Sequence, residues 1–330
     1  MDRFEILVGH IEIQHARNGR RAVLSKRWRE RQRPSSDAYE FASADRKKGV
    51  ITTAELCKGP HVLYVNFLNL PLGATAGLFV LSLVAYAGAG ELYGAPTQNI
   101  NVYLDKLVSS YPNWIDSRSN EYLILKNGAK FAISDHRTDK SFNELLEHPD
   151  IDDMFYAPYP AGSIPKQPST NFDPGRVRFE PLFITMYGDC KKNEVTSRLR
   201  TIEWLSAHNG GSLTITTANG VDTALSAVSR ELDKFPSDFF KFLVPTSGTY
   251  NCRAIAGSSA RSMHAYGAAI DLNVRHSDYW RWSTNPDNPI WKNRIPIEIV
   301  RVFEKHGFIW GGYWYHFDTM HFEYRPELLP

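Results

Sequence analysis

Two stretches decide the fold and the chemistry expected of this chain: residues 262–271 read SMHAYGAAID, and residues 311–323 read GGYWYHFDTMHFE. Each combines imidazole and carboxylate side chains with small residues. Glycine and alanine at 267–269 let the backbone turn and come close to a neighbouring segment. We expect short strands at 268–273 and 320–324, in a domain that mixes helices with a small, mostly local sheet and is therefore of the α+β class.

The two stretches offer the ligands of a catalytic zinc site. Such a site takes three protein ligands from His, Asp or Glu and leaves a fourth position open for water. His264, Asp271 and His321 can supply these three ligands. A further carboxylate must stay outside the ligand set, because it takes a proton from water and passes it to the leaving amine. Asp318 is the candidate for this general base.

Two neighbouring residues, Glu323 and His316, are candidates for supporting roles. Glu323 has the same parity as His321 on a strand, so it either orients that imidazole or is a surface charge. His316 is a supporting donor, a rival metal ligand or an exposed residue. A lone His or Asp is more often an ordinary core or surface group, but the ordered pair of motifs favours a supporting role for both.

The motifs resemble those of a known family. Residues 262–273 fit S-x-H-x-x-G-x-A-x-D, and residues 310–324 fit a closing D-x-x-H block. With them, residues 180–330 resemble the zinc D-alanyl-D-alanine carboxypeptidases and L-alanyl-D-glutamate peptidases. That family includes vancomycin-resistance carboxypeptidases and several phage endolysins, and it shares its fold with lysostaphin-type peptidases and the hedgehog signalling domain. The resemblance implies a small antiparallel sheet with flanking helices, Zn²⁺ on the three ligands named above, and the same aspartate as base.

The segment 248–264, GTYNCRAIAGSSARSMH, also resembles the family's region ahead of the Ser-x-His motif. The resemblance implies that Arg253 binds a carboxylate or carbonyl of the substrate and that Ser262 contacts the substrate beside the metal. A planar guanidinium can hold a carboxylate through two hydrogen bonds. A structural ion pair is the alternative for Arg253, and Arg261 takes its place if the loop is registered differently.

These features predict a zinc metallopeptidase that hydrolyses stem peptides of bacterial peptidoglycan, as an L-alanyl-D-glutamate endopeptidase or a D-alanyl-D-alanine carboxypeptidase. Asp318 stands three residues before the last histidine, where the carboxypeptidase branches of the family typically carry Glu, and this difference favours the endopeptidase. The alternative is a non-catalytic module of the same fold that binds cell-wall peptides. The sequence suggests no protein partner.

The composition argues against several other classes of protein. The chain has 330 residues, of which 42% are hydrophobic and 22% charged, and a net charge of +2, which is not typical of a dedicated nucleic-acid binder. Residues 1–60 carry 13 Lys and Arg against 8 Asp and Glu. We interpret them as a disordered basic leader. A nucleic-acid or membrane-surface role for residues 17–48 is a weaker alternative, because they show no recognisable reader fold.

An apolar segment follows the leader. No charged residue occurs between Lys58 and Glu91, and residues 77–87, GLFVLSLVAYA, end in Ala-Tyr-Ala. Residues 61–90 therefore indicate a signal peptide with a small-residue cleavage site, or a membrane anchor. A buried helix pair of a soluble domain is the third possibility. Both membrane-related interpretations export the rest of the chain, so we expect a protein of the periplasm or cell envelope.

We expect an accessory region at 91–180 ahead of the peptidase domain at 181–330. Within it, EYLILK, Asn-Gly and AKFAIS predict a β-hairpin over 121–134. The Pro- and Gly-rich residues 157–176 predict a linker or wrapped loop near the domain boundary. Apolar spacing further predicts helices at 194–208, 221–235 and 296–306, and strands at 213–217 and 249–255.

Three cysteines, Cys57, Cys190 and Cys252, are too few for a disulfide scaffold and lack the spacing of a zinc ribbon. A metal bound here must therefore use other ligands. In an oxidising compartment Cys190 and Cys252 can pair and leave Cys57 free, although sequence alone does not decide the pairing.

Overall fold

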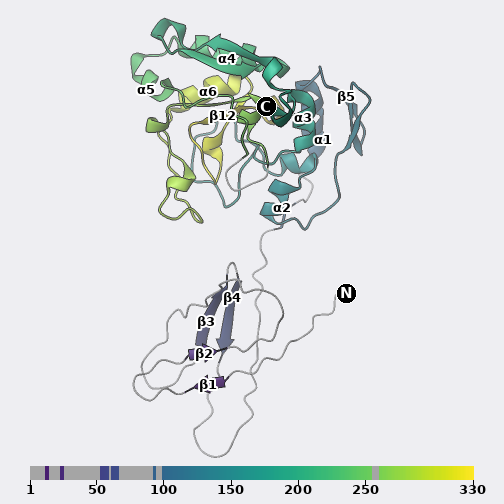
Figure 1. The fold of residues 1–330 in the computed structure, drawn as a ribbon, viewed down its shortest axis with the longest axis vertical. Coiled ribbons are helices and arrows are strands. Elements are labelled where there is room, and N and C mark those ends of the chain that lie inside the picture. Colours follow the sequence, from purple (N-terminus) through teal and green to yellow (C-terminus); the bar gives the residue numbers. More distant parts are fainter. Residues whose placement is uncertain are drawn as a thin grey trace, which may run out of the picture. The chain divides into compact units, whose positions relative to one another are not determined.

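The chain divides into two compact units, Met1–Ala89 and Gly90–Pro330, and every candidate site residue belongs to the second (Figure 1). None of the helices in the described residues is long and apolar enough to cross a lipid bilayer. The computed structural model describes residues 12–14, 23–25, 53–58, 61–66, 92–93, 99–254 and 260–330.

The described residues of the first unit are short antiparallel strands. β1 (Glu12–Gln14) pairs with β2 (Val23–Ser25), and β3 (Thr53–Lys58) pairs with β4 (His61–Asn66). Most of residues 1–60, for which the sequence predicts a disordered basic leader, lie outside the described residues. The apolar run at 77–87, on which the prediction of a signal peptide or membrane anchor rests, lies outside the described residues.

A three-stranded antiparallel sheet in the second unit brings the two sequence motifs together. Its strands are ordered β10 (Ala269–Asp271), β12 (His321–Tyr324) and β11 (Phe308–Trp310). The register pairs Asp271 with His321, so residues fifty positions apart in the sequence face each other across two strands. The two strands predicted for the motifs are confirmed, and so is the α+β class.

Helices cover this sheet. α6 (Ile297–Lys305) packs against β11 and against α4 (Val221–Leu232). Both helices confirm the sequence prediction, and α4 buries the predicted apolar face through Val221, Leu225, Val228 and Leu232. Two shorter helices, α3 (Glu180–Tyr187) and α5 (Phe240–Leu243), complete this part of the unit.

The segment 194–208 is not a helix, contrary to our prediction. Its residues Leu199–Glu203 form strand β8, which pairs with β9 (Ser212–Thr216), the strand predicted at 213–217. The sequence Asn209-Gly210-Gly211, which we read as a helix stop, lies in the connection of this β-hairpin. Asn209 and Gly211 there take positive φ angles of 54° and 93°. Apolar spacing alone did not distinguish the two structures.

The strand predicted at 249–255 is also absent from the described residues of that segment. Its backbone makes only isolated bridges, between Gly248 and Asp271 and between Ala254 and Arg261. The segment therefore runs beside the metal-ligand strand as an extended loop.

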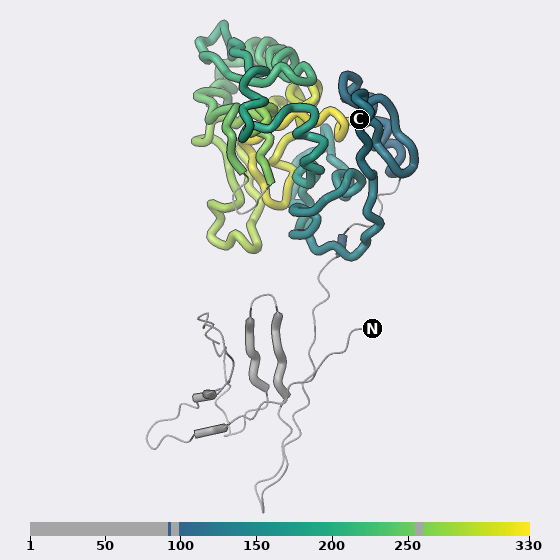
Figure 2. The backbone as a smooth tube through the Cα atoms, turned by 45° about the vertical axis from the view of Figure 1, so that its right-hand side comes forward, coloured from purple at the N-terminus to yellow at the C-terminus, as the bar shows by residue number. Residues whose placement is uncertain are grey.

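The accessory region shares one hydrophobic core with the rest of its unit. Its elements are α1 (Ile100–Ser110), the sheet β5 (Ile115–Arg118), β6 (Tyr122–Leu125) and β7 (Lys130–Ala132), and α2 (Phe142–Glu147). Strands β6 and β7 confirm the predicted hairpin. Figure 2 shows the C-terminus beside this region, where the turn Pro326–Leu328 contacts α1. Residues 157–176 therefore lie within one compact unit rather than between two.

Candidate active site

The three predicted metal ligands converge on one point. Asp271 Oδ1 lies 3.1 Å from His264 Nε2 and 3.0 Å from His321 Nδ1, and these two ring nitrogens are 3.2 Å apart. Asp271 and His321 come from paired strands, and His264 comes from the turn Met263–Tyr266 that precedes β10. The fold thus gathers three donor atoms from both sequence motifs.

Gly267 makes the connection between the turn and the strand possible. Its φ is +65°, a left-handed conformation in which a side chain is strained. Its carbonyl accepts a hydrogen bond from Thr216 N at 2.9 Å, and a Cβ at position 267 would lie 3.2 Å from that nitrogen. The small residues at 267–269 led us to expect such a close approach between this backbone and a neighbouring segment.

A second hydrogen bond fixes each imidazole. His264 Nδ1 donates to the Thr249 carbonyl at 2.5 Å, and His321 Nε2 donates to Glu323 Oε2 at 2.9 Å. With these protons in place, the lone pairs of His264 Nε2 and His321 Nδ1 face each other and the Asp271 carboxylate. Three electron-pair donors so close together need a positive charge between them, either a proton or a metal ion.

The donor set fits a zinc ion. Tetrahedral zinc with bonds of about 2.0–2.1 Å separates its ligand atoms by about 3.3 Å, and the separations here are 3.0, 3.1 and 3.2 Å. In the metal-free protein, burial alone would lower the pKa of His321. The hydrogen bonds that His321 makes with Asp271 and Glu323, together with the negative charges of these two residues, raise this pKa to about 10. Burial alone would raise the pKa of Asp271, yet both imidazoles hold it far below its usual range.

Glu323 is buried and is not a surface charge. It accepts hydrogen bonds from His321, from Arg178 Nη1 at 3.3 Å and from Arg325 Nη1 at 3.3 Å. Burial alone would raise the pKa of Glu323, but the charge of Arg178 and the hydrogen bond and charge of His321 lower it to about 2. An ionised carboxylate at this place makes the contact expected of a residue that orients His321.

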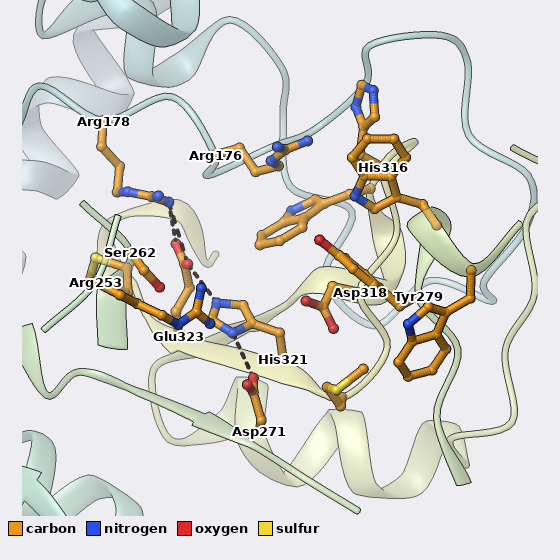
Figure 3. Close-up of a pocket in the computed structure, with 15 residues that line it drawn as sticks. Arg176, Arg178, Arg253, Ser262, Asp271, Tyr279, His316, Asp318, His321 and Glu323 are labelled. Carbon is orange, nitrogen blue, oxygen red and sulfur yellow. Dashed lines mark hydrogen bonds and ion pairs between the residues drawn. The ribbon is translucent and has the colours of Figure 1, made fainter. Parts of the chain in front are cut away.

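Asp318 lies beside the three ligands but outside their set. Figure 3 shows its carboxylate next to His321. Its Oδ1 atom is shut off from solvent and has no hydrogen-bond partner among the described residues. Burial, and then the charge of Asp271, raise the pKa of Asp318 to about 7. A carboxyl group with a pKa near neutrality can both take up and release a proton at physiological pH.

The two predicted substrate-binding residues also line the pocket over this site. Arg253 is exposed, and its guanidinium makes no hydrogen bond or ion pair to a described residue. Ser262 is buried, and its Oγ accepts a hydrogen bond from His264 N at 3.3 Å. Arg261 instead forms ion pairs with Glu180 at 2.9 Å and Asp189 at 2.8 Å, which assigns the structural ion pair to Arg261.

His316 has a different place from the one expected. Its Nδ1 donates to Asp173 Oδ2 at 2.6 Å, and its backbone N–H donates to Asp173 Oδ1 at 2.9 Å. No hydrogen bond joins His316 to the three metal-ligand candidates within the part of the chain that the structure describes. His316 lines the same pocket, but its hydrogen bonds connect it to Asp173 of the accessory region and not to the predicted metal ligands.

The pocket has a volume of ≈ 330 Å³ and contains residues that the sequence analysis missed. Arg176 comes from the segment that we read as a linker, where no motif distinguishes it. An aromatic wall is formed by residues near 280 and in the second motif. The density of aromatic residues there was visible in the sequence, but composition did not assign it to a pocket. The lining residues that were not predicted are Arg176, Arg178, Met263, Tyr279, Trp280, Trp282, Trp314 and Met320.

A disulfide between Cys190 and Cys252 anchors the loop that carries Arg253. This is the pairing that the sequence left open. Cys252 precedes Arg253 directly, so the bond ties the segment that carries Arg253 to the turn Cys190–Lys192, which follows α3. The position of Arg253 at the pocket therefore depends on a covalent link outside the sheet.

A comparison with protein families agrees with this site. Residues 256–324 match the model of a family described as D-alanyl-D-alanine carboxypeptidase, and this segment contains all three metal-ligand candidates and Asp318. No curated protein and no solved structure matches the chain. The match supports the family resemblance seen in the two motifs, and it shows that residues 256–324 are similar to the D-alanyl-D-alanine carboxypeptidase family.

Proposed function

We propose that the protein is a zinc-dependent peptidase that hydrolyses stem peptides of bacterial peptidoglycan. The observation that carries this proposal is the convergence of His264, Asp271 and His321, beside a carboxylate oxygen of Asp318 that has no hydrogen-bond partner among the described residues. A structural zinc site closes all four positions with protein ligands, whereas three ligands and a nearby carboxylate open to a pocket are typical of a catalytic site.

The residues of the pocket divide the chemical work. A zinc ion on the three ligands would supply a Lewis acid that acidifies water and polarises a carbonyl. Asp318 accepts the proton of the attacking water and later delivers it to the departing nitrogen, for which a pKa of about 7 is well suited. Arg253, which has no partner among the described residues, binds a carboxylate of the peptide and so positions the bond to be cut.

The bond that is cut is tested directly. The full-length protein is incubated with purified muropeptides, with and without a zinc chelator, and the products are analysed by mass spectrometry. Chelator-sensitive loss of the terminal D-alanine identifies a carboxypeptidase, as the matched family's description suggests. Release between L-alanine and D-glutamate identifies the endopeptidase that Asp at position 318 favours. If no muropeptide is cleaved by protein that contains zinc, the proposal is wrong and the non-catalytic peptide-binding module takes its place.

We also propose that the second unit acts outside the cytoplasmic membrane, where its substrate lies. The apolar residues 61–90 support this location, and a Cys190–Cys252 disulfide is the kind of bond that persists in an oxidising compartment. Fractionation of cells that express the full chain with a C-terminal tag tests it. Recovery of the tag only in the cytoplasm would contradict the proposed location.

A further inference from the structure

The pocket contains a second cluster of nitrogen-bearing side chains besides Arg253, and it is formed by Arg176 and His316. Both residues line the pocket. His316 belongs to the loop ahead of β12, whereas Arg176 belongs to the accessory region and lies outside the segment matched to the family. Neither residue is among the metal-ligand candidates, so the proposed reaction leaves their place in the pocket unexplained.

Asp173 holds these two side chains together. Its carboxylate is fully buried, and Oδ2 accepts hydrogen bonds from His316 Nδ1 at 2.6 Å and from Arg176 Nη1 at 2.7 Å. Because Nδ1 of the imidazole is taken, Nε2 is the atom with which His316 can bind another group. The remaining donors of the Arg176 guanidinium make no hydrogen bond to a described residue.

Aromatic side chains hold the cluster rigid. The His316 ring stacks on Phe142 with centroids 6.0 Å apart and planes 9° apart, and Trp280 meets it edge-on at 4.7 Å. Phe142 is the first residue of α2, whose start is fixed by a capping box of Ser141 and Glu144. A ligand would therefore meet side chains that have already lost much of their rotational freedom, which lowers the entropic cost of binding.

The cluster and Arg253 occupy different parts of the pocket. Figure 3 shows Arg253 next to His321, whereas Arg176 and His316 lie together at a distance from them. Burial and the charge of Asp271 dominate the pKa of Asp318, but the charges of Arg176 and Arg253 both lower it. Both guanidiniums line the pocket that also contains the proposed base.

We propose that Arg176 and His316 form a second carboxylate-binding subsite, which takes a carboxylate of the substrate other than the one held by Arg253. Asp173 occupies Nδ1 of His316 and one nitrogen of Arg176, so a substrate carboxylate meets Nε2 of His316 and the remaining N–H groups of the guanidinium. The aromatic surroundings lower the local dielectric constant and so strengthen the attraction of the Arg176 guanidinium for an anion. This inference rests on the proposed function and adds that the enzyme recognises two anionic groups of one peptide.

Two carboxylates of a stem peptide have the required chemistry. One is the α-carboxylate of the γ-linked D-glutamate residue. The other is the group that distinguishes meso-diaminopimelate from lysine at the third position. Three synthetic pentapeptides separate them: L-Ala-γ-D-Glu-meso-diaminopimelate-D-Ala-D-Ala, the same peptide with L-lysine at the third position, and the same peptide with D-isoglutamine at the second.

The test measures kcat/KM of the full-length, zinc-loaded protein for each peptide. The variants are Arg176→Gln, Arg176→Lys and His316→Gln, with Arg200→Gln as control, because Arg200 is an exposed arginine ion-paired with Asp222 on another surface. Arg176→Gln is expected to lower kcat/KM by about 10- to 100-fold for peptides that carry the recognised carboxylate. The same variant is expected to change kcat/KM by no more than about twofold for the peptide that lacks this group. The identity of that peptide shows which carboxylate the subsite binds.

Two further results distinguish a failure of the proposed subsite from a failure of the proposed peptidase function. Peptide binding measured by calorimetry shows whether Arg176 contributes even where nothing is cleaved: an Arg176-dependent preference without turnover supports the subsite and contradicts the peptidase. If the wild type cleaves the peptides, and Arg176→Gln and His316→Gln either do not change kcat/KM or lower it equally for all three peptides, the proposed subsite is wrong. The proposal of a peptidase is not affected by that result. Arg176→Lys, which keeps the charge, is expected to retain part of the preference.

Discussion

His321 donates its Nε2 hydrogen to Glu323 at 2.9 Å, and this contact is the first link of a buried chain of charges. Glu323 also accepts from Arg325, Arg325 pairs with Glu327, and Glu327 accepts from the Tyr111 hydroxyl at 2.7 Å. The chain begins at a proposed metal ligand and ends next to α1 of the accessory region. Because a buried charge without its partner is costly, the links support one another and fix the His321 ring.

Replacing Glu323 with Gln tests the first link. We expect the affinity for zinc to fall by about 10- to 100-fold, because the imidazole loses the carboxylate that orients it and increases its basicity. Competition with a chromophoric chelator measures the affinity. Glu203→Gln, an exposed position on β8, is the control and is expected to leave the affinity unchanged. An unaltered zinc affinity in Glu323→Gln would show that Glu323 does not position His321.

The Cys190–Cys252 disulfide is expected to matter for substrate binding as well as for stability. A variant with Ser at both positions should lose about 2–4 kcal/mol of unfolding free energy, because a long loop is no longer closed in the unfolded state. Since Cys252 adjoins Arg253, KM should rise more than kcat falls. Chemical denaturation and steady-state kinetics measure the two effects. Cys57→Ser is the control, and a fall in kcat at constant KM would argue against this role of the loop.

The acidic residues of the accessory region predict a pH dependence of stability. Burial, and then the hydrogen bond with and charge of Asp150, raise the pKa of Asp152 from 3.8 to about 8. Between these values the folded protein keeps a proton that the unfolded chain has lost, so unfolding becomes easier as the pH rises. Lys140, which pairs with Asp150 and Asp153, does not remove this effect.

Asp152→Asn removes the titrating group. Relative to the wild type, its unfolding free energy should rise by about 1–2 kcal/mol between about pH 4 and pH 8, a figure reduced from the full linkage value because the side chain is only partly buried. Urea denaturation at a series of pH values measures the difference. Asp116→Asn, on an exposed position of β5, should show no such trend. A constant difference between Asp152→Asn and the wild type would refute the pKa assignment.

The metal-ligand candidates were predictable from the sequence because both motifs are local. Two of the three ligands, Asp271 and His321, lie on strands that pair with each other, and the third lies in the turn just before β10. The helix predicted at 194–208 was wrong, because its apolar residues belong to different elements: Leu199 and Ile202 lie on β8, whereas Val195 precedes this strand and Leu205 follows it. Helical spacing of a few residues does not decide between these structures.

The rest of the pocket could not be predicted, because it depends on contacts between distant segments. Arg176 and Asp173 lie within the Pro- and Gly-rich segment 157–176, which has no helical or strand periodicity, and only the packing of this segment on the second motif brings them to His316. The sequence around His316 likewise contains no sign of its hydrogen-bond partner, because Asp173 lies far away in the chain. Local patterns thus gave the metal-ligand candidates, whereas the walls of the pocket required the tertiary structure.

The measurement that tests the central claim most directly compares the full-length wild type with Asp318→Asn and His264→Ala. Zinc content and hydrolysis of a stem pentapeptide are determined on the same samples, with and without a chelator. The account predicts one zinc per wild-type chain and chelator-sensitive cleavage, full zinc but at least about a hundredfold slower cleavage in Asp318→Asn, and loss of both in His264→Ala. Full zinc occupancy in His264→Ala, or undiminished cleavage in Asp318→Asn, would contradict it.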